Sequence, residues 1–462
     1  MVTKKSFYSK IYKNKFIGYP NGVIADGLVF LSGIFGNDQN DLNKNFDKIP
    51  LQGRDKKQGY FVADEREATV ALDSWSVHNQ INELLKEIGT DENQILRQHI
   101  WQTDKRYFPV YENIRQKLQS SPAPSSGLGI SSFHEINDFT IGIDLIAVIP
   151  NSNNALSERE VLVDVYNKVL PSASFYAQAV TSGPLLFTAG HIAIKTSEEG
   201  KPLVSGFDDI PEEGRFLATG RSHPDSRDGP IIAQTWYVYK ELERTLTDHG
   251  MSLEDSINIT VFLADTRDVS AFHRVHSHFF NDILPALTIV GFDEVGHRGC
   301  LIEIEITAVS KQTELEKKPN GYPKIAPLKA SESFQIGNFV FCSGMFDLSQ
   351  TGEDKKRIKM PIGLDNFEEQ FPEKNELTYQ IINSMTQLSD ALINAGSSLK
   401  NLLKVTVYLK QKEDFRVFDV IFKTLVEDKN LPAIEAIVVP NPGPRPSSLF
   451  QIEAISLINE NV

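Results

Sequence analysis

One pattern occurs three times along the chain. An apolar, strand-like run ends in a small residue followed by glycine at 27–33, 184–190 and 338–344 (GLVFLSG, PLLFTAG and NFVFCSG). The final glycines of these runs are 157 and 154 residues apart. Self-similarity at a fixed period indicates repeated structural units. Length alone, 462 residues at roughly 100 to 200 per domain, predicts two to four domains, and the repeat spacing selects three.

Each repeat continues with the same order of elements. An amphipathic helical stretch is followed by a glycine break, a β-rich run, a second helical stretch, a Pro-Ala step and an alternating strand. The unit therefore reads β-β-α-β-α-β, which is an α+β domain. Polar linkers at 150–160 and 311–324 separate the units and place the predicted domains at 1–155, 156–315 and 316–462.

The helices of each predicted unit lie on one face of its sheet, so the other face must be buried elsewhere. Neighbouring repeats of the same chain are the available cover. We therefore expect the three domains to form an intrachain pseudo-trimer, with sheets inward and helices outward. Because one chain would complete this assembly, we predict a monomer.

The amino-acid composition limits the binding partners and the cellular compartment that we expect for this protein. The 47 Lys and Arg against 61 Asp and Glu give a net charge of -14, the wrong sign for broad contact with nucleic-acid phosphates. Cys300 and Cys342 are the only cysteines and fit neither a disulfide framework nor a zinc site. No apolar run approaches the ~18 residues of a membrane helix. We expect a cytoplasmic protein without membrane or nucleic-acid partners; the lysine-rich N-terminus is either a solvated tail or, less consistently with its lack of arginine, a mitochondrial presequence.

The second repeat carries the most distinctive motifs: FYAQAV (175–180), LLFTAGHI (185–192), MSLEDSINITVFLAD (251–265) and LIEIEITAV (301–309). In this order they resemble the RidA family, also called the YjgF family, of small imine and enamine deaminases. The resemblance recurs once per repeat. It implies a chorismate-mutase-like fold, homotrimers in the family, and ligand clefts between adjacent subunits. One chain would then hold three inequivalent clefts.

The resemblance implies roles for single positions in a reaction where water attacks an imine carbon and ammonia leaves. The family's tyrosine ahead of the first long strand matches Tyr19 and Tyr176, which we expect to bind ligand, whereas the third repeat has Ala330. The glutamate that positions water matches Glu303. Glu303 is therefore the predicted catalytic base.

The other repeats depart from the family at the glutamate position, where they have Gly142 and Gln451. Two residues further on, an acid recurs in all three repeats. Because strand side chains alternate, both acids share one face of the strand. The recurring acid is more consistent with a role in the shared fold, and Glu303 with a role in mechanism. The recurring acids are Asp144, Glu305 and Glu453.

The family's arginine, which pairs with a substrate carboxylate, is missing from every repeat. Its positions hold Ser125, Leu287 and Ile434. Leu and Ile offer no hydrogen-bond donor in place of a guanidinium. We therefore expect ordinary 2-imino acids not to be substrates. Arg298, in the turn before Glu303, either reaches the cleft from another direction or faces solvent.

Histidines are concentrated in the second repeat, which has seven of the ten, while the third has none. Such a concentration suits proton transfer or ligation near neutral pH. His191 follows the strand-end Gly190, and we expect either His191, as a catalytic residue, or the Gly190 backbone to hold the polarised atom of the ligand. His273 matches a frequent cleft asparagine of the family and is expected to bind the ligand. His273 and His276 could supply at most two metal ligands from one helical face, so no metal or other cofactor is predicted.

A long insertion at 195–230 distinguishes the second repeat. A loop of this length is often a lid or binding element. His223, Arg221 and Arg227 would then contact an anionic ligand; a surface excursion without function is the alternative.

The leading hypothesis is a RidA-like hydrolase or deaminase of a small imine, enamine or related carbonyl metabolite, with its main cleft around the second repeat. In the rival hypothesis the chain is a noncatalytic small-molecule-binding or scaffold protein that keeps the fold and lacks the family arginine. The missing arginines favour the rival, and the concentrated histidines favour the enzyme.

Overall fold

The computed structural model describes residues 2–36, 65–134, 139–150, 159–161, 176–195, 198, 200, 202–219, 227–280, 284–321, 329–348 and 371–458. Within these residues the strands form three seven-stranded sheets. The mixed α+β class predicted from the repeat is confirmed, and each repeat supplies the central strands of one sheet.

The first sheet has the order β1-β2-β3-β7-β4-β5-β14. Helices α2 (Glu65–Ile88) and α3 (Phe108–Leu118) cover it. Its long strands are buried on both faces, because helices pack on one side and the other sheets on the other. The strands are β1 (Lys5–Phe7), β2 (Gly22–Ala25), β3 (Leu28–Phe35), β4 (Ile95–Gln102), β5 (Ser125–Gly129), β7 (Ile141–Val148) and β14 (Glu294–Val295).

The second sheet has the order β13-β12-β15-β10-β9-β8, with β11 also pairing with β15. Helices α5 (Gly229–Thr247) and α6 (Val269–Phe279) cover it. The strands are β8 (Arg159–Val161), β9 (Ala179–Ser182), β10 (Leu185–Thr188), β11 (His191–Ile192), β12 (Ser256–Leu263), β13 (Ala286–Gly291) and β15 (Ile302–Val309).

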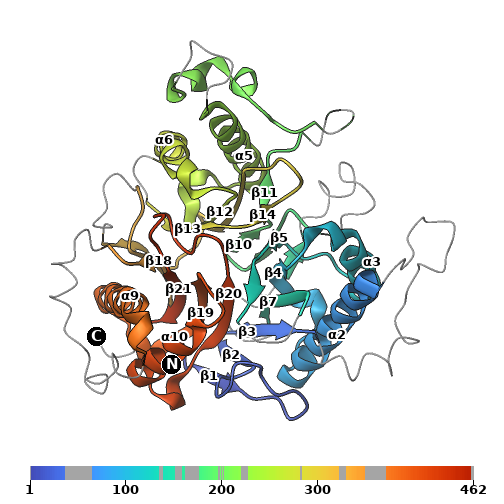
Figure 1. Ribbon diagram of the computed structural model, residues 1–462, viewed down its shortest axis with the longest axis vertical. Helices are drawn as coiled ribbons and strands as arrows, with labels where there is room; N and C mark the ends of the chain where they lie inside the picture. The colour runs from blue at the N-terminus through green and yellow to red at the C-terminus, as the bar shows by residue number, and fades with distance from the viewer. Residues whose placement is uncertain are drawn as a thin grey trace.

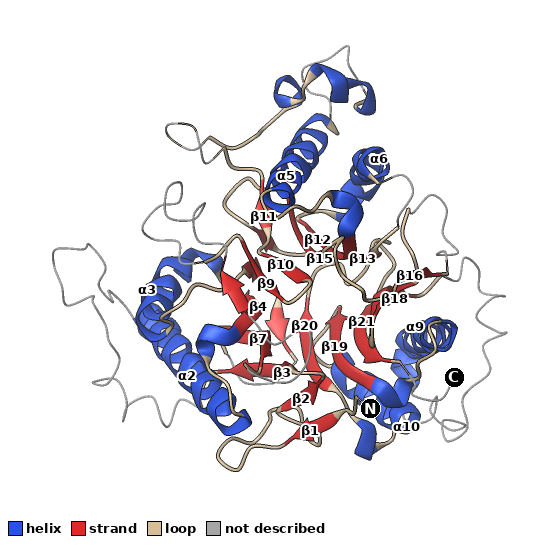
Figure 2. Cartoon of the chain, turned by 180° about the vertical axis from the view of Figure 1, so that it is seen from behind, coloured by secondary structure: helices blue, strands red, loops and turns tan. Residues whose placement is uncertain are grey.

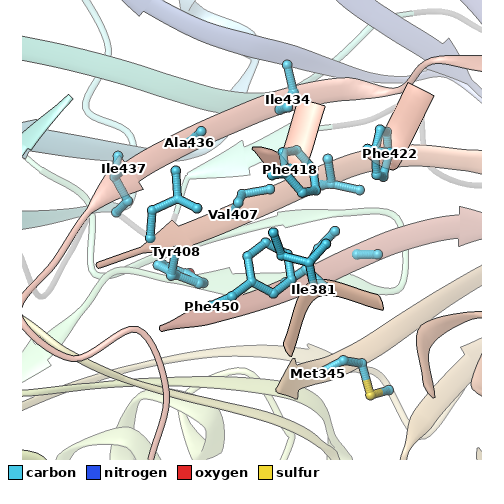
Figure 3. Packing of buried hydrophobic residues seen from close by; sticks show 14 of the residues in the cluster. Met345, Ile381, Val407, Tyr408, Phe418, Phe422, Ile434, Ala436, Ile437 and Phe450 are labelled. Atoms are coloured by element: carbon cyan, nitrogen blue, oxygen red, sulfur yellow. The ribbon is translucent and has the colours of Figure 1, made fainter. Parts of the chain in front are cut away.

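The third sheet has the order β16-β17-β18-β21-β19-β20-β6 and is covered by α9 (Asn375–Asn394) and α10 (Asp414–Val426). Figure 3 shows part of its core, where Phe418 of α10 lies among apolar side chains of the sheet such as Val407 and Ile434. The strands are β16 (Lys317–Asn320), β17 (Ser333–Ile336), β18 (Phe339–Phe346), β19 (Leu402–Leu409), β20 (Ala433–Val438), β21 (Phe450–Leu457) and β6 (Ser132–Phe133).

The glycine breaks predicted from the sequence end the first helix of each sheet. Gly89, Gly250 and Gly396 follow α2, α5 and α9 with φ of 99°, 69° and 73°. This left-handed conformation suits glycine because it has no Cβ, so glycine commonly ends a helix there. Short 3-10 helices complete the connections: η3 (Glu92–Gln94), η4 (Lys105–Tyr107), η5 (Phe207–Asp209), η6 (Glu212–Leu217), η7 (Leu253–Asp255), η8 (Thr266–Asp268), η9 (Pro372–Lys374), η10 (Leu399–Asn401) and η11 (Asp428–Asn430).

The strands of all three sheets lie toward the middle of the molecule, and the helix pairs lie on the outside (Figures 1 and 2). Short segments cross between the sheets. Strand β14 pairs with β5 of the first sheet, and β6 pairs with β20 of the third. Asn441, beyond the end of β20, pairs with Gly291 at the end of β13 in the second sheet. The segment after β13 of the second sheet thus joins the first sheet, and the segment after β5 of the first sheet joins the third. Asn441, which follows β20 of the third sheet, joins the second, so the exchange forms a closed cycle.

A buried charged cluster joins the sheets where they meet. His99 of β4 contacts both Asp144 of β7 (3.2 Å) and Glu305 of β15 (3.0 Å). Lys404 of β19 pairs with Asp144, and Arg97 of β4 lies 3.4 Å from Glu305. Burial alone would lower the pKa of His99, but the Glu305 and Asp144 carboxylates raise it to about 10. The recurring acids Asp144 and Glu305 therefore hold the sheets together, as the sequence indicated.

The described residues of the insertion at 195–230 include two short 3-10 helices. Its η5 and η6 pack on the outer helices: Arg274 of α6 donates to the Leu217 carbonyl at 2.8 Å, and Gly214 lies against the Trp236 ring of α5. Arg227 is exposed, and Arg221 and His223 lie outside the described residues.

No helix among the described residues is long and apolar enough to cross a membrane.

Candidate functional site

The three sheets meet at three junctions, each next to a strand-end glycine identified in the sequence. At the first-second junction, the Gly190 N–H donates to the Ser125 carbonyl of β5 at 3.4 Å. At the second-third junction, the Leu287 N–H of β13 donates to Ser343 Oγ at 2.8 Å. At the third-first junction, the Ile434 N–H of β20 donates to Ser32 Oγ at 3.0 Å. The second-third and third-first junctions thus share one hydrogen bond, from a strand N–H to a serine hydroxyl. At the first-second junction Ala189 replaces that serine, and the Gly190 N–H is the donor instead.

Glu303 lies at the first-second junction, on β15. A Cβ added at Gly190 would stand 1.9 Å from Glu303 Oε1, so only glycine leaves room for this carboxyl group. The Gly296 N–H, just after β14, donates to Glu303 Oε2 at 3.1 Å. The side chain is only 3% exposed. The structure thus brings together two residues that the sequence predicted, Glu303 and Gly190.

The surroundings of Glu303 at this junction set the pKa of its carboxyl group. Burial raises its pKa to about 7, although the nearby Lys105 ammonium works in the opposite direction. A carboxyl group with this pKa exchanges a proton near neutral pH, which is the requirement for general acid-base catalysis.

Lys105, from η4 of the first repeat, is a member of the site that the sequence did not reveal. Its Nζ donates to the Gly127 carbonyl of β5 (2.5 Å) and to the Gly296 carbonyl (2.6 Å). Burial lowers the pKa of Lys105, and the charge of Glu303 partly restores it. Within the described residues Lys105 forms no ion pair with a carboxylate. The positive charge of Lys105 is therefore not used in an ion pair with a described carboxylate, and it lowers the pKa of the nearby Glu303.

Arg115 of α3 is a second cation that the sequence did not single out. Its Nη1 donates to Ser125 Oγ at 3.1 Å, so a guanidinium contacts the position where the family has its own arginine. The same group is 2.8 Å from Glu112, and both side chains are buried. Arg115 is thus already neutralised by a carboxylate, which limits its use for a second anion.

Tyr176 is half-buried at the start of the second sheet. The next residue, Ala177, donates its N–H to the Ala123 carbonyl, just ahead of β5, at 3.3 Å. Tyr176 therefore lies at the same junction as Glu303. Its contact with ligand stays a prediction.

His191 does not lie with Glu303. Ile192 is the residue opposite Glu303 in the β11–β15 pair, and His191 is opposite Ile304, so the His191 side chain projects from the other face. It contacts Thr245 Oγ1 of α5 at 3.1 Å and the Ala189 carbonyl at 3.0 Å. Burial lowers the pKa of His191 to about 4. The structure therefore places the His191 ring against the helical layer of the second sheet and not beside Glu303, whereas the Gly190 backbone, the other group that the sequence suggested, lies at the junction.

His273 is also apart from Glu303, whereas Arg298 follows Gly296 in the turn that contacts Glu303. His273 lies on α6, one turn before His276, whose Nε2 is 3.0 Å from the Lys329 carbonyl at the edge of the third repeat. It therefore belongs to the second-third side of the second sheet. Arg298 is exposed in its turn, which is the alternative that the sequence left open. Among the described residues no His, Cys, Asp and Glu group of three could hold a metal ion.

Tyr19 lies at the third-first junction, where it packs on Phe422 of α10 (ring centroids 6.3 Å apart). This junction is filled. A Cβ at Gly33 would stand 2.3 Å from Glu435 Oε2, and a Cβ at Gly142 would stand 2.7 Å from the Phe133 ring. Burial raises the pKa of Glu435 well above the ordinary range, so the side chain is held as an uncharged filler.

The chain is similar to known proteins over parts of its length. The model of a family described as endoribonuclease L-PSP matches residues 220–310 and 325–458. The mitochondrial protein mmf2 of Schizosaccharomyces pombe is 28% identical over 148 residues, which is 32% of this chain and 96% of mmf2. A RutC family protein of Pyrococcus abyssi is 29% identical over 133 residues, covering 29% of this chain and 84% of its own length.

A solved structure from Klebsiella pneumoniae, whose description names an endoribonuclease, is 33% identical to the chain. The match covers 29% of this chain and 99% of that one, with a TM-score of 0.27. Each of these relatives therefore corresponds to about one third of the chain.

Proposed function

Because the chain belongs to the RidA/YjgF family, whose model is that of endoribonuclease L-PSP, we propose that it is a hydrolase of a small imine, enamine or related carbonyl metabolite. The reaction would take place at the first-second junction with Glu303 as the acid-base group. One observation carries this proposal: a buried carboxyl group with a pKa near 7 faces a glycine that leaves it room.

In the proposed reaction Glu303 removes a proton from water as the water oxygen bonds to the imine carbon. The same carboxyl group returns that proton to the nitrogen, which gives a carbinolamine. Glu303 then takes the proton of the new hydroxyl group and delivers it to the nitrogen as the C–N bond breaks, so a carbonyl compound and ammonia leave and the carboxylate is restored. The Gly296 N–H holds Oε2, which leaves Oε1 on the side of Gly190 for the water. Lys105 limits the rise in the pKa of Glu303, so that part of the population is ionised at neutral pH.

The substrate we expect is not an ordinary 2-imino acid. Position 125 is a serine, and the guanidinium that reaches it, Arg115, already pairs with Glu112 at 2.8 Å. A substrate carboxylate would have to displace that buried ion pair, which is unfavourable. Imines and enamines without a carboxylate next to the reacting carbon fit this junction better.

The experiment is ammonia release from a panel of freshly generated imines and enamines, with an RNA substrate as a further arm. We expect turnover that Glu303→Gln lowers by about 100-fold or more, in the range for loss of a general base. Glu254→Gln, on an exposed carboxylate, is the matched control and should keep full activity. Absence of turnover on every imine, or turnover that Glu303→Gln leaves unchanged, would contradict the proposal.

The second candidate is a noncatalytic binding or scaffold role. The filled third-first junction favours it, because Glu435 and Phe133 occupy the space that a ligand would need there. Binding without turnover at the first-second junction would select this role over the enzyme.

We also infer that the domains 1–155, 156–315 and 316–462 act together as an intrachain pseudo-trimer. The closed cycle of exchanged segments supports this inference, because each sheet is completed by a segment from another repeat. A cytoplasmic location stays a prediction, since relatives of this chain include mitochondrial proteins.

A further inference from the structure

A cavity lies at the second-third junction, away from Glu303. It has an empty volume of about 700 Å³, which includes space open to solvent. Its wall comes from β13 of the second sheet and from β18, α9 and β21 of the third. The residues used below are Leu287, Ala330, Glu332, Ser343, Asp390 and Gln451.

The side chains that would make this junction a deaminase site have all been replaced. Leu287 stands at the family's arginine position, Ala330 at its tyrosine position and Gln451 at its glutamate position. None of the three carries a charge, and Ala330 leaves the volume of a phenol ring unfilled. Gln451 lies against the strand-end Gly344, as a carboxyl side chain does at each of the other two junctions, but it carries no charge. The small Ala330 accounts for the open, largely apolar space.

One polar atom in the wall lacks a partner. Gln451 is fully buried, and its Nε2 donates to the Ile289 carbonyl at 3.1 Å. That bond fixes the amide so that Oε1 is an acceptor, and no described residue donates to it. A buried acceptor without a donor is costly, so a ligand that supplies an N–H or O–H group would be favoured there.

The remaining polar groups of the wall also exclude an anion. Asp390 is exposed and Glu332 half-buried, and the cavity is lined by no Lys, Arg or His among the described residues. The Ser343 hydroxyl is already used, because it accepts from the Leu287 N–H (2.8 Å) and donates to the Ser331 carbonyl (2.6 Å). A negatively charged ligand would meet the like charge of Asp390, and no cation among the described wall residues would offset it.

We propose that this cavity binds an apolar small molecule that carries a hydrogen-bond donor and no negative charge, with Gln451 Oε1 as the acceptor. The site is separate from the proposed hydrolase site and requires no chemistry. It gives the chain a second ligand, which would be chemically unlike the first.

Three probes of similar size test the proposal on the full chain: benzamide, benzylamine and benzoate. Calorimetry and saturation-transfer NMR should detect binding of benzamide or benzylamine, and at least tenfold weaker binding of benzoate. Benzamide is a neutral donor and benzylamine a cationic one, so comparing their affinities shows which charge the cavity prefers. Benzoate binding as tight as both donors, or no detectable binding of either donor, would overturn the proposal.

Two variants and one control substitution test where the probe binds. Leu287→Trp fills the cavity and should abolish binding, while Ile393→Trp adds the same side chain at an exposed position and should not. Gln451→Leu keeps the approximate shape and should weaken binding about tenfold or more, the loss expected for one buried hydrogen bond. Circular dichroism and thermal unfolding verify that both variants fold. Binding unaffected by Leu287→Trp, or lost in Glu303→Gln instead, would place the probe elsewhere and refute the assignment.

Discussion

At the residue scale, Glu303 shows how burial and a single backbone donor prepare a carboxyl group for proton transfer. Burial favours the protonated form, whereas the Gly296 N–H and the Lys105 charge favour the ionised form. Glu305, two residues away, has the same burial but contacts Arg97 and His99, which lower its pKa to about 2 against the effect of burial. Of these two acids on one strand, Glu303 therefore exchanges a proton near neutral pH, whereas Glu305 stays ionised there.

The raised pKa of Glu303 predicts a pH-dependent cost to stability. The folded pKa is about 7 and the unfolded one about 4.3, so the folded state is favoured by proton binding, and this advantage is lost as the pH rises through 7. Glu303→Gln should therefore raise the free energy of unfolding at pH 8, by up to about 3 kcal/mol, and change it little at pH 5. Urea unfolding at both pH values measures this. Equal effects at pH 5 and pH 8 would show that the pKa is not raised.

At the element scale, periodicity and turn signals were sufficient to predict the repeated strands and helices. The β-rich run predicted after the glycine break of each repeat is β12 (Ser256–Leu263) in the second repeat and β19 (Leu402–Leu409) in the third. The exchanged strands β6 and β14 were not predicted, because a two-residue strand has no periodicity and its partner is far away in sequence. Lys105 was missed for the same reason: it reaches Glu303 only because β14 docks on β5. The sequence could not show that the His191 side chain faces away from Glu303 while its neighbour Gly190 lies at the junction.

The docking of β14 on β5 predicts that a distant glycine controls the site. A Cβ at Gly129 would stand 2.7 Å from Glu294 Cβ and 3.1 Å from the Glu294 backbone nitrogen, so Gly129→Ala must push β14 away. We expect the Gly296 contacts to Glu303 and Lys105 to be lost, activity to fall about tenfold or more, and stability to fall by about 1–3 kcal/mol. Ammonia-release assays and urea unfolding test this. Gly206→Ala, where a Cβ meets nothing within 4 Å, is the control; equal activity in both variants would contradict the prediction.

At the scale of the whole molecule, the charged cluster around His99 links strands of all three sheets. His99 connects β7 and β15, and Lys404 brings β19 to the same Asp144 carboxylate. A cavity lined by Arg97, Glu453 and other polar residues of the three sheets adjoins it. The recurring acids fit the role in the fold that the sequence indicates, but their cation partners from other repeats, Lys404 for Asp144 and Arg97 for Glu305, are far away in sequence and cannot be read from it.

This cluster predicts a loss of stability at alkaline pH. The pKa of His99 is about 10 in the folded chain and about 6.5 when unfolded, so its contribution is complete below about 6.5 and is lost as the pH rises to 10. His99→Gln leaves two buried carboxylates with one cation fewer and should cost roughly 3–5 kcal/mol at pH 7. Urea unfolding at pH 7 and pH 10 checks this, and we expect the difference between the two proteins to shrink at pH 10. A difference that stayed constant would show that His99 is not charged in the folded chain.

The closed cycle of exchanged segments also predicts the oligomeric state. Strand β14 occupies the edge of β5, β6 occupies the edge of β20, and Asn441 occupies the end of β13, so each junction is completed within one chain. A closed set of interfaces offers no further copy an equivalent place to bind. Multi-angle light scattering should therefore give 51.8 kDa, the mass of one chain, independent of dilution. A stable species of three chains would instead mean that the repeats exchange these segments between molecules, and the junctions described above would then form between chains.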